Sequence, residues 1–296
     1  MKKFQVLTDS TSDVEKSFRD EYELDYLKMV FTINSRDYDA DLDWTDIKPE
    51  EYYGLMRKGY RSVTGQVKAS EVETKVEKAF KEGLDVLYIA CSAKLSGSIS
   101  TAKMYAEDLL KKYPDRKLIC YDSMRTNYAE GLMAMDAAKM ALDGLSIDEC
   151  VAKLNDERLK YQTFATVGSL EWFRKAGRIK ATAAFFGNLF AVKPIVIGDA
   201  NGNNYAYKKV KGRKPSLDDI VQTTIERIED PENKIVFVAH ADCPQDAEYV
   251  KERLLASGKI KNVHISPLGP IIGATTGPDT ISVNFYGKKI DIAGEE

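Results

Sequence analysis

A regular alternation of short apolar runs with helix-forming segments limits the folds open to this 296-residue chain more than any other feature of its sequence. Runs of strand length occur at Phe4–Leu7, Asp85–Ala90 and Lys117–Tyr121. Segments with helical spacing follow the later two, at 100–112 and 128–142. Because each helix returns the chain to the same edge of the sheet, this order predicts a doubly wound parallel sheet.

The second half of the chain adds signals for antiparallel pairing. Strand-like segments at 195–197 and 205–210 flank Asn201-Gly202-Asn203, which is a hairpin signal. Segment 281–286 before Gly287-Lys288-Lys289 predicts a final hairpin. At roughly 100–200 residues per domain, we expect two α/β domains. Residues 1–160 form the N-terminal domain with the parallel sheet, and residues 161–296 form the C-terminal domain with a mixed sheet.

Several local patterns predict where elements begin. Residues 12–15, 70–73 and 146–149 each have the Ser-x-x-Glu spacing of a capping box. Ser216 is expected to cap a helix that runs to residue 229. Tyr26–Ile33 is expected to form one strand, because it is rich in apolar and strand-forming residues.

Composition and charge exclude several classes of protein. A formal net charge of −3 argues against a general nucleic-acid binder, which needs a basic face. No apolar run approaches the ~20 residues that cross a bilayer, and the N-terminus turns polar too early for a signal peptide. The four cysteines form no Cys-x-x-Cys pair and are expected to be reduced thiols. We therefore expect a cytoplasmic protein.

Small hydroxyl residues and glycines gather where predicted strands end, at 9–13, 64–66, 92–98 and 122–123. The loops after parallel strands meet at one edge of the sheet, where ligands bind. Residues 92–98 also precede a helix, whose free amides favour an anion. The same serines could serve only as caps and turn residues, and the pattern by itself leaves both interpretations open.

The motifs of several enzyme classes are absent. There is no phosphate-binding GxxxxGK[ST] or GxGxxG, and no GxSxG of a hydrolase. The two histidines, His240 and His264, lie at or in strands and are interpreted as structural. No spacing predicts a metal site, and Asp9 and Asp13 are interpreted as helix caps. A hydrolase with Ser96 as nucleophile stays an alternative without a visible base.

Two further segments stand out by composition. Residues 269–278 combine three glycines and two prolines with an apolar pair and two threonines. They are interpreted as a tight turn, or as a loop that lets the backbone approach a ligand. Residues 172–179 end a helix with Arg174, Lys175 and Arg178. Cations at a helix C-terminus indicate a solvated end or a docking patch for a partner.

In their order and spacing these motifs resemble the DegV family of bacterial fatty-acid-binding proteins over essentially the whole chain. The motifs that carry the resemblance are Asp9-Ser10-Thr11-Ser12-Asp13, Thr64-Gly65-Gln66, Leu95-Ser96-Gly97-Ser98, Tyr121-Asp122-Ser123, Lys175-Ala176-Gly177-Arg178-Ile179, Lys193-Pro194 and Gly269–Pro278. The resemblance implies that a long-chain fatty acid lies between the two α/β domains. It also implies a lipid carrier without cofactor or enzymatic activity.

The resemblance places the carboxylate of the fatty acid at Thr64 and Ser96. Other residues expected at the ligand are Gly65, Gly97, Ser98, Gly273, Thr275 and Thr276. The residues expected to line a tunnel for the acyl chain are Phe164, Phe185, Phe186, Leu189, Ile271 and Ile272, with Phe190 and Ile195 as further candidates. Each of these apolar residues also fits an ordinary core.

The family further implies a partner, a separate fatty-acid kinase that phosphorylates the bound acid for phospholipid synthesis. Expected docking residues are Arg174, Arg178, Lys211 and Arg213, and transient contact with a membrane surface is compatible with them. Two positions depart from the family pattern, because Thr275 replaces a histidine and Lys211 replaces an arginine. A lipid-sensing regulatory protein without transfer is therefore a further alternative.

Overall fold

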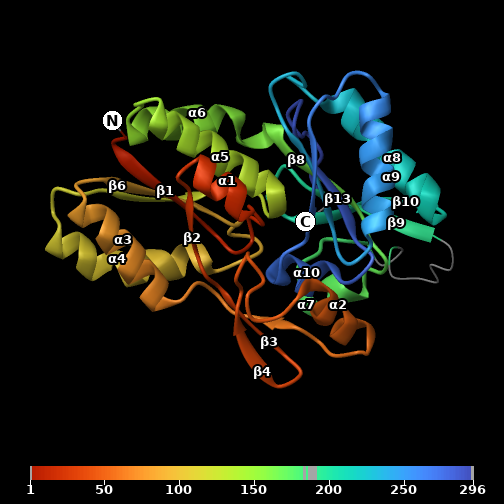
Figure 1. Ribbon diagram of the computed structural model, residues 1–296, viewed down its shortest axis with the longest axis horizontal. Coiled ribbons are helices and arrows are strands. Elements are labelled where there is room, and N and C mark those ends of the chain that lie inside the picture. Colours follow the sequence, from red (N-terminus) through yellow and green to blue (C-terminus); the bar gives the residue numbers. More distant parts are fainter. Residues whose placement is uncertain (1, 183–184, 186–191, 295–296) are drawn as a thin grey trace.

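The computed structural model describes residues 2–182, 185 and 192–294 and contains two large sheets with a helix between them (Figure 1). The helices are α1 (Lys16–Glu21), α2 (Pro49–Arg57), α3 (Ala69–Lys81), α4 (Ser98–Lys112), α5 (Asn127–Leu142), α6 (Ile147–Glu157), α7 (Glu171–Ala176), α8 (Arg213–Arg227), α9 (Pro244–Ala256) and α10 (Pro270–Thr276). The strands are β1 (Phe4–Asp9), β2 (Asp25–Leu27), β3 (Val30–Ile33), β4 (Arg36–Asp39), β5 (Val63–Thr64), β6 (Asp85–Ala90), β7 (Leu118–Asp122), β8 (Tyr161–Thr166), β9 (Val192–Gly198), β10 (Asn204–Lys211), β11 (Val236–His240), β12 (Val263–Pro267) and β13 (Ile281–Tyr286).

The first sheet is parallel, with strand order β2-β1-β6-β7. Helices α3 and α4 cover one face of it, and α5 and α6 cover the other. Strand β6 is buried along nearly all of its length, because a parallel strand between two helical layers has no face in water. The predicted doubly wound sheet is confirmed.

The second sheet is mixed, with strand order β10-β9-β8-β13-β11-β12. The predicted hairpin of β9 and β10 is confirmed. Strand β13 lies in the middle of the sheet and pairs antiparallel with both β8 and β11. The predicted final hairpin is wrong, because the described chain beyond Tyr286 forms no further strand and Gly287 makes an isolated bridge to Ile228.

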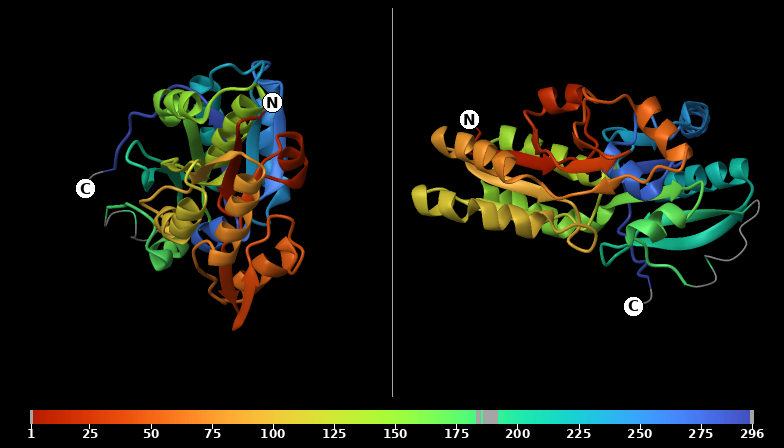
Figure 2. Two further views of the ribbon diagram at one scale, coloured as in Figure 1. Left: turned by 90° about the vertical axis from the view of Figure 1, so that its left-hand side faces the viewer. Right: turned by 90° about the horizontal axis from the view of Figure 1, so that it is seen from below.

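Helix α5 lies between the two sheets and joins them. Twelve of its 16 residues are buried, as expected of a helix with protein on every side. Tyr128 stacks on Phe237 of β11 with ring centroids 4.2 Å apart. Figure 2 shows the two sheets side by side along the long axis. We call residues up to 160 the parallel-sheet half and the rest the mixed-sheet half.

The hydrophobic core extends across the division between the two halves. Leu7 and Val86 of the parallel sheet belong to the same buried cluster as Phe237, Leu268 and Ile271 of the mixed-sheet half. The sheets therefore separate near residue 160, while the packing is continuous across it. A domain boundary near residue 160 stays a prediction.

A third, three-stranded sheet of order β4-β3-β5 was not predicted. The single strand expected over Tyr26–Ile33 is wrong, because the chain leaves the parallel sheet after Leu27 and enters the small sheet at Val30. Strand β5 pairs with β3, with Thr64 opposite Phe31. The small sheet thereby holds Thr64 in place.

The capping box at residues 146–149 is confirmed, with reciprocal hydrogen bonds between Ser146 and Glu149. The other two are wrong, because α1 and α3 start without a side-chain cap. At the first of them, the Glu15 carboxylate lies 2.7 Å from both His264 Nε2 and Ser266 Oγ, and so serves tertiary packing.

Two further helices, α8 and α10, differ from the sequence-based expectation. Helix α8 begins after Gly212, so Ser216 lies inside its first turn, where its hydroxyl donates to Arg213 O. Residues 269–278 contain helix α10 instead of a turn alone. Pro270 suits the first helical position, and Gly277, with a φ of 77°, ends the helix.

All four cysteines are free thiols, as predicted. Within the described ranges, no helix is long and apolar enough to cross a membrane.

Candidate ligand-binding site

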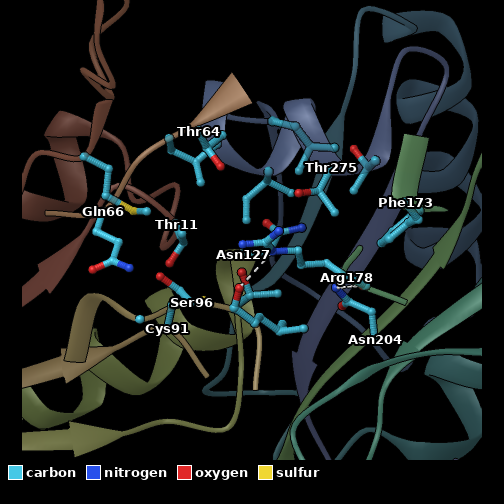
Figure 3. A pocket seen from close by; sticks show the side chains of 18 of the residues that line it. Thr11, Thr64, Gln66, Cys91, Ser96, Asn127, Phe173, Arg178, Asn204 and Thr275 are labelled. Carbon is cyan, nitrogen blue, oxygen red and sulfur yellow. Dashed lines mark hydrogen bonds between the residues drawn. The ribbon is translucent and has the colours of Figure 1, made fainter. Parts of the chain in front are cut away.

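A cavity of about 630 Å³ lies between the two sheets, beside the start of α5 (Figure 3). This volume is in the range of ~300–1,000 Å³ found for small-molecule sites. Its walls come from the loops after β1 and β6, the segment from β5 to α3, strands β8, β9 and β13, and helix α10. Both halves of the chain are therefore needed to build it.

The hydroxyls singled out in the sequence lie around this cavity. Thr64 comes from β5, Ser96 from the loop between β6 and α4, and Thr275 from α10. All three are half-buried, and Figure 3 shows them on different walls of the cavity. Gly65, Gly97, Thr276, Ile271 and Ile272 also line it. The fold thus brings together residues that are up to 212 positions apart, from Thr64 to Thr276.

Ser98 lies behind Ser96 and does not line the cavity. Its backbone N–H donates to Ser96 Oγ at 3.2 Å, and the two hydroxyl oxygens are 3.0 Å apart. Ser98 Oγ also accepts a hydrogen bond from Val67 N at 3.4 Å. The buried Ser98 side chain therefore ties the Ser96 loop to the segment after β5.

Gly273, Phe164 and Phe185 also lie away from the cavity. A Cβ atom on Gly273 would lie 2.4 Å from Tyr53 Oη, so this glycine lets α10 pack against α2. Phe164 belongs to the core under α8 and α9, which also holds the Ile195 side chain. Phe185 packs in a small cluster near β10. Phe186, Leu189 and Phe190 lie outside the described residues.

The mixed-sheet wall was missed by sequence reasoning. It is formed by Thr163 and Ala165 of β8, Val196 and Ile197 of β9, Asn204 of β10 and Ser282 of β13, together with Asn127 of α5 and Phe173 of α7. Thr163 and Ala165 are two positions apart, which is the period of one strand face. This alternation was the one signal in the sequence, but it does not tell which face meets a cavity.

The basic residues divide into two groups. Arg178 lines the cavity, and its Nε donates to Leu95 O at 3.2 Å. Its Nη1 donates to Ala176 O, while its Nη2 has no partner in the part of the chain that the structure describes. Arg174 instead pairs with Glu171 on its own helix, and Arg213 pairs with Asp246 at 2.7 Å. Lys211 is exposed at the end of β10.

A family model described as an uncharacterised protein of the DegV family matches residues 3–288. The chain belongs to the DegV family. It is 34% identical over 287 residues to a DegV domain-containing protein of Clostridium perfringens, which covers 97% of this chain and 98% of that protein.

Solved structures of DegV proteins share the fold. A Thermus thermophilus protein described as fatty-acid-binding superposes with a TM-score of 0.84 at 24% identity, covering 97% of this chain and 100% of that one. A stearic-acid-binding protein from Eubacterium ventriosum gives a TM-score of 0.83 at 22% identity, covering 96% and 98%. The parallel sheet, the mixed sheet and their arrangement are therefore those of the DegV fold.

In this DegV chain two buried acidic residues, Asp9 and Glu130, lie under the cavity wall. Thr11 lines the cavity, and its hydroxyl oxygen is 2.6 Å from both Asp9 Oδ1 and Glu130 Oε2. A hydroxyl has one proton, so Thr11 donates to one carboxyl group and accepts from the other. One of the two acids must therefore be protonated.

We assign this proton to Glu130. Burial, with the nearby charge of Asp9, raises the pKa of Glu130 well above its usual range. Asp9 is the better-supported carboxylate, because it also accepts from Thr11 N at 2.9 Å and from Tyr88 Oη at 2.6 Å. Burial likewise raises the pKa of the neighbouring Asp13.

The cavity carries little catalytic chemistry. Neither His240 nor His264 lines it, and no base contacts Ser96 among the described residues. Cys91 does line it, but burial raises the pKa of this thiol, which keeps it protonated and a poor nucleophile. No group of three acidic, histidine or cysteine residues in the described ranges could hold a metal ion.

Proposed function

We propose that this DegV chain binds a long-chain fatty acid in the cavity and carries it unchanged. The observation that carries the proposal is the cavity itself, which combines the hydroxyls of Thr64, Ser96 and Thr275 with the apolar side chains of Ile271 and Ile272. Such a mixture suits a ligand with one polar end and a long apolar body. DegV proteins of the same fold are described as binding fatty acids, including stearic and heptadecanoic acid.

The carboxylate of the acid is placed at Thr64 and Ser96. Both hydroxyls can turn to donate hydrogen bonds to it, and Thr275 offers a third donor from α10. The free Nη2 of Arg178 supplies a positive charge, which a threonine cannot. Arg178 therefore has a place in ligand binding as well as at the surface.

Burial of the acyl chain supplies most of the affinity. A chain of about 16 carbons has some fifteen methylenes, worth ~0.8 kcal/mol each, or roughly 12 kcal/mol in total. Ordering the chain and removing water from the carboxylate subtract from this gain. The hydroxyls then mainly fix the orientation of the acid.

A carrier fits the site better than a hydrolase. Ser96 shares its hydrogen bonds with Ser98, and no base contacts it in the described part of the chain. A hydrolase with Ser96 as nucleophile would need such a base to take the proton. The acid would instead be handed, still bound, to a separate fatty-acid kinase that docks over the cavity opening. Such a partner is consistent with a cytoplasmic place for the chain and with transient contact at a membrane surface.

The decisive experiment is extraction of lipid from purified protein under denaturing conditions, followed by mass spectrometry. We expect a long-chain acid in near-stoichiometric amount, and uptake of added oleate or palmitate by delipidated protein. Finding neither bound lipid nor uptake would refute the proposal. Ester hydrolysis that disappears in Ser96→Ala would favour the hydrolase instead.

A second experiment separates the carrier from a lipid-sensing regulator, a role suggested by Thr275. With a fatty-acid kinase and ATP, a carrier supports formation of acyl phosphate, and a regulator binds lipid without it. Arg174→Glu should lower kinase turnover but leave acid affinity intact, because Arg174 does not line the cavity. Arg178→Glu should lower both. Equal turnover in both variants and the parent would remove these residues from the docking surface.

A further inference from the structure

The mixed-sheet wall of the cavity carries a connected group of polar side chains, which we call the polar strip: Asn127, Thr163, Ser282 and Asn284. Asn127 Nδ2 donates to Ser282 Oγ at 2.8 Å, and Asn284 Nδ2 donates to the same oxygen at 3.2 Å. Thr163 Oγ1 donates to Asn284 Oδ1 at 2.7 Å. Asn127, Ser282 and Asn284 are at most 3% exposed, and the strip faces the cavity through Asn127, Thr163 and Ser282.

Two side chains of the strip that line the cavity carry donor hydrogens without an acceptor among the described residues. Ser282 Oγ already accepts two hydrogen bonds, so its own proton must point elsewhere, and no acceptor for it exists among the residues described. The orientation of the Asn127 amide is fixed, because its Oδ1 accepts from Tyr128 N at 2.6 Å. Its Nδ2 therefore has a second hydrogen that no described group accepts.

Pinning α5 to the mixed sheet does not need these extra donors. The bond from Asn127 to Ser282 already links the two, and the spare hydrogens of Ser282 and Asn127 belong to side chains in the cavity wall. Unpaired donors on buried side chains are unfavourable, and a plain methylene chain offers them nothing to bond. Ala165, Val196 and Phe173 line the cavity from the same half and suit methylenes well. Donors and apolar residues thus share one wall.

We propose that the acid which this cavity prefers carries an oxygen function, a hydroxyl or a keto group, partway along its chain. The inference rests on the proposed function and specifies its ligand. The oxygen accepts from the Ser282 hydroxyl and the Asn127 amide, and a hydroxyl group on the ligand donates in turn to Thr163 Oγ1. Figure 3 shows Asn127 in the middle of the cavity, between Ser96 and Thr11 on one side and Arg178 and Asn204 on the other. Because the strip is fixed in the wall, the oxygen is expected at one particular carbon of the acyl chain.

The test compares octadecanoic acid with its 9-, 10- and 12-hydroxy derivatives on delipidated full-length protein, by competitive displacement of a fluorescent acid. One positional isomer should bind at least about tenfold more tightly than octadecanoic acid, which corresponds to about 1.4 kcal/mol. The other isomers should gain less, because the strip is fixed in place. An effect of general polarity would favour all isomers alike.

Ser282→Ala should bring the ratio of hydroxy acid to plain acid close to one, with little change for the plain acid. Ser216→Ala is the matched control: Ser216 is equally buried in the mixed-sheet half, but its hydroxyl donates to Arg213 O and it does not line the cavity. This control should keep the full preference. Thr163→Val is the second variant if Ser282→Ala does not fold, and it should reduce the preference for hydroxy acids but not for the matching keto acid.

The outcomes separate the two proposals. Equal binding of all acids by the parent, or an unchanged preference in Ser282→Ala or Thr163→Val, overturns the inference and leaves fatty-acid binding standing. A loss of plain-acid affinity in Ser282→Ala as large as that of the hydroxy acid also overturns it, because the strip would then hold the carboxylate. No binding of any acid refutes the proposed function itself.

Discussion

At the scale of single residues, hydroxyl groups are proposed to bind both polar parts of the ligand, its carboxylate and the oxygen on its chain. Thr64 and Ser96 reach the cavity from separate elements, and neither is needed to hold the core. Both can therefore be changed without a large effect on folding. Their value lies in hydrogen bonds to a charged group, which are worth roughly 1.5–3 kcal/mol each.

We expect Thr64→Val combined with Ser96→Ala to weaken binding of a long-chain acid by at least about tenfold, measured by displacement of a fluorescent acid. Circular dichroism should show an unchanged fold. Thr32→Val with Ser100→Ala is a matched control, because both residues lie on neighbouring elements outside the cavity. Undiminished affinity in the first variant would remove Thr64 and Ser96 from the site.

Glu130 gives a prediction on pH. Burial raises its pKa above the ordinary value of 4.5, so above about pH 4.5 the folded protein holds more protons than the unfolded chain. The stabilising effect of the protonated acid is complete below pH 4.5 and is lost as pH rises towards the folded-state pKa. Stability should therefore fall with rising pH, by up to about 1.4 kcal/mol per pH unit from this group.

Glu130→Gln should remove this contribution, since a neutral amide can donate to Thr11 and accept from Thr8 as the protonated acid does. We expect the free energy of unfolding in urea to fall less steeply between pH 5 and 8 than in the parent, with the variant more stable at pH 8. The exposed Glu73→Gln is the control. Parallel pH profiles for Glu130→Gln and the parent would mean that Glu130 is ionised in the folded protein.

Thr64 and Ser96 were found from sequence because they stand in ordered motifs after predicted strands. Glu130 was not found from sequence, because an acid inside a helical segment is by default assigned to the solvent side. Its burial follows from the position of α5 between two sheets, and a single segment does not carry that information. Ser282 and Asn127 were missed for the same reason.

At the scale of elements, close packing of α5 rests on one glycine. A Cβ atom on Gly131 would lie 2.6 Å from Ser12 O and 2.7 Å from Val14 Cγ2. This contact lets the loop after β1, which carries Thr11, lie directly on the helix. Gly54 in α2 is the opposite case, a helical glycine with nothing within 4 Å of the added atom.

These two glycines should respond to alanine with opposite signs. Gly131→Ala is expected to destabilise the protein by about 1–3 kcal/mol through overpacking, despite the higher helix propensity of alanine. Gly54→Ala should stabilise it by up to about 1 kcal/mol. Urea unfolding of the two variants measures both effects. Similar changes in the two would show that propensity, and not the contact of α5 with the loop, governs position 131.

Element boundaries were predictable where neighbouring residues decide them, as at Ser146 and Glu149, whose side chains form the reciprocal bonds of the capping box. At Glu15 the same spacing failed, because the side chain bonds to β12 instead. The break between β2 and β3 also escaped prediction. The strand-forming residues continue through it, and only the pairing partners change from one sheet to another.

At the scale of the whole molecule, the two halves should unfold together, because α5 packs on both sheets and the core crosses residue 160. The two tryptophans offer a test, with Trp44 in the parallel-sheet half and Trp172 on α7 in the mixed-sheet half. Trp172→Phe leaves Trp44 as the reporter, and Trp44→Phe leaves Trp172. We expect coincident urea transitions relative to each variant's circular dichroism, as for a two-state protein.

Separate transitions for fluorescence and circular dichroism in either variant would show that the halves are independent folding units. An added long-chain acid should shift both reporters to higher urea, because the cavity draws residues from both halves. A shift confined to one reporter would place the ligand within one half.

The central place of β13 affects how the protein is made. Strands β8 and β11 have no contact with each other in the sheet until β13 pairs with both, and β13 is the last strand in the described residues. During synthesis on the ribosome, the parallel sheet can form early, but the mixed sheet and the cavity must wait until residue 286 has emerged. Until then two strand edges stay open to pairing with other chains. The lipid binding proposed above therefore has to wait until β13 has been made, and chaperones can protect the open edges until then.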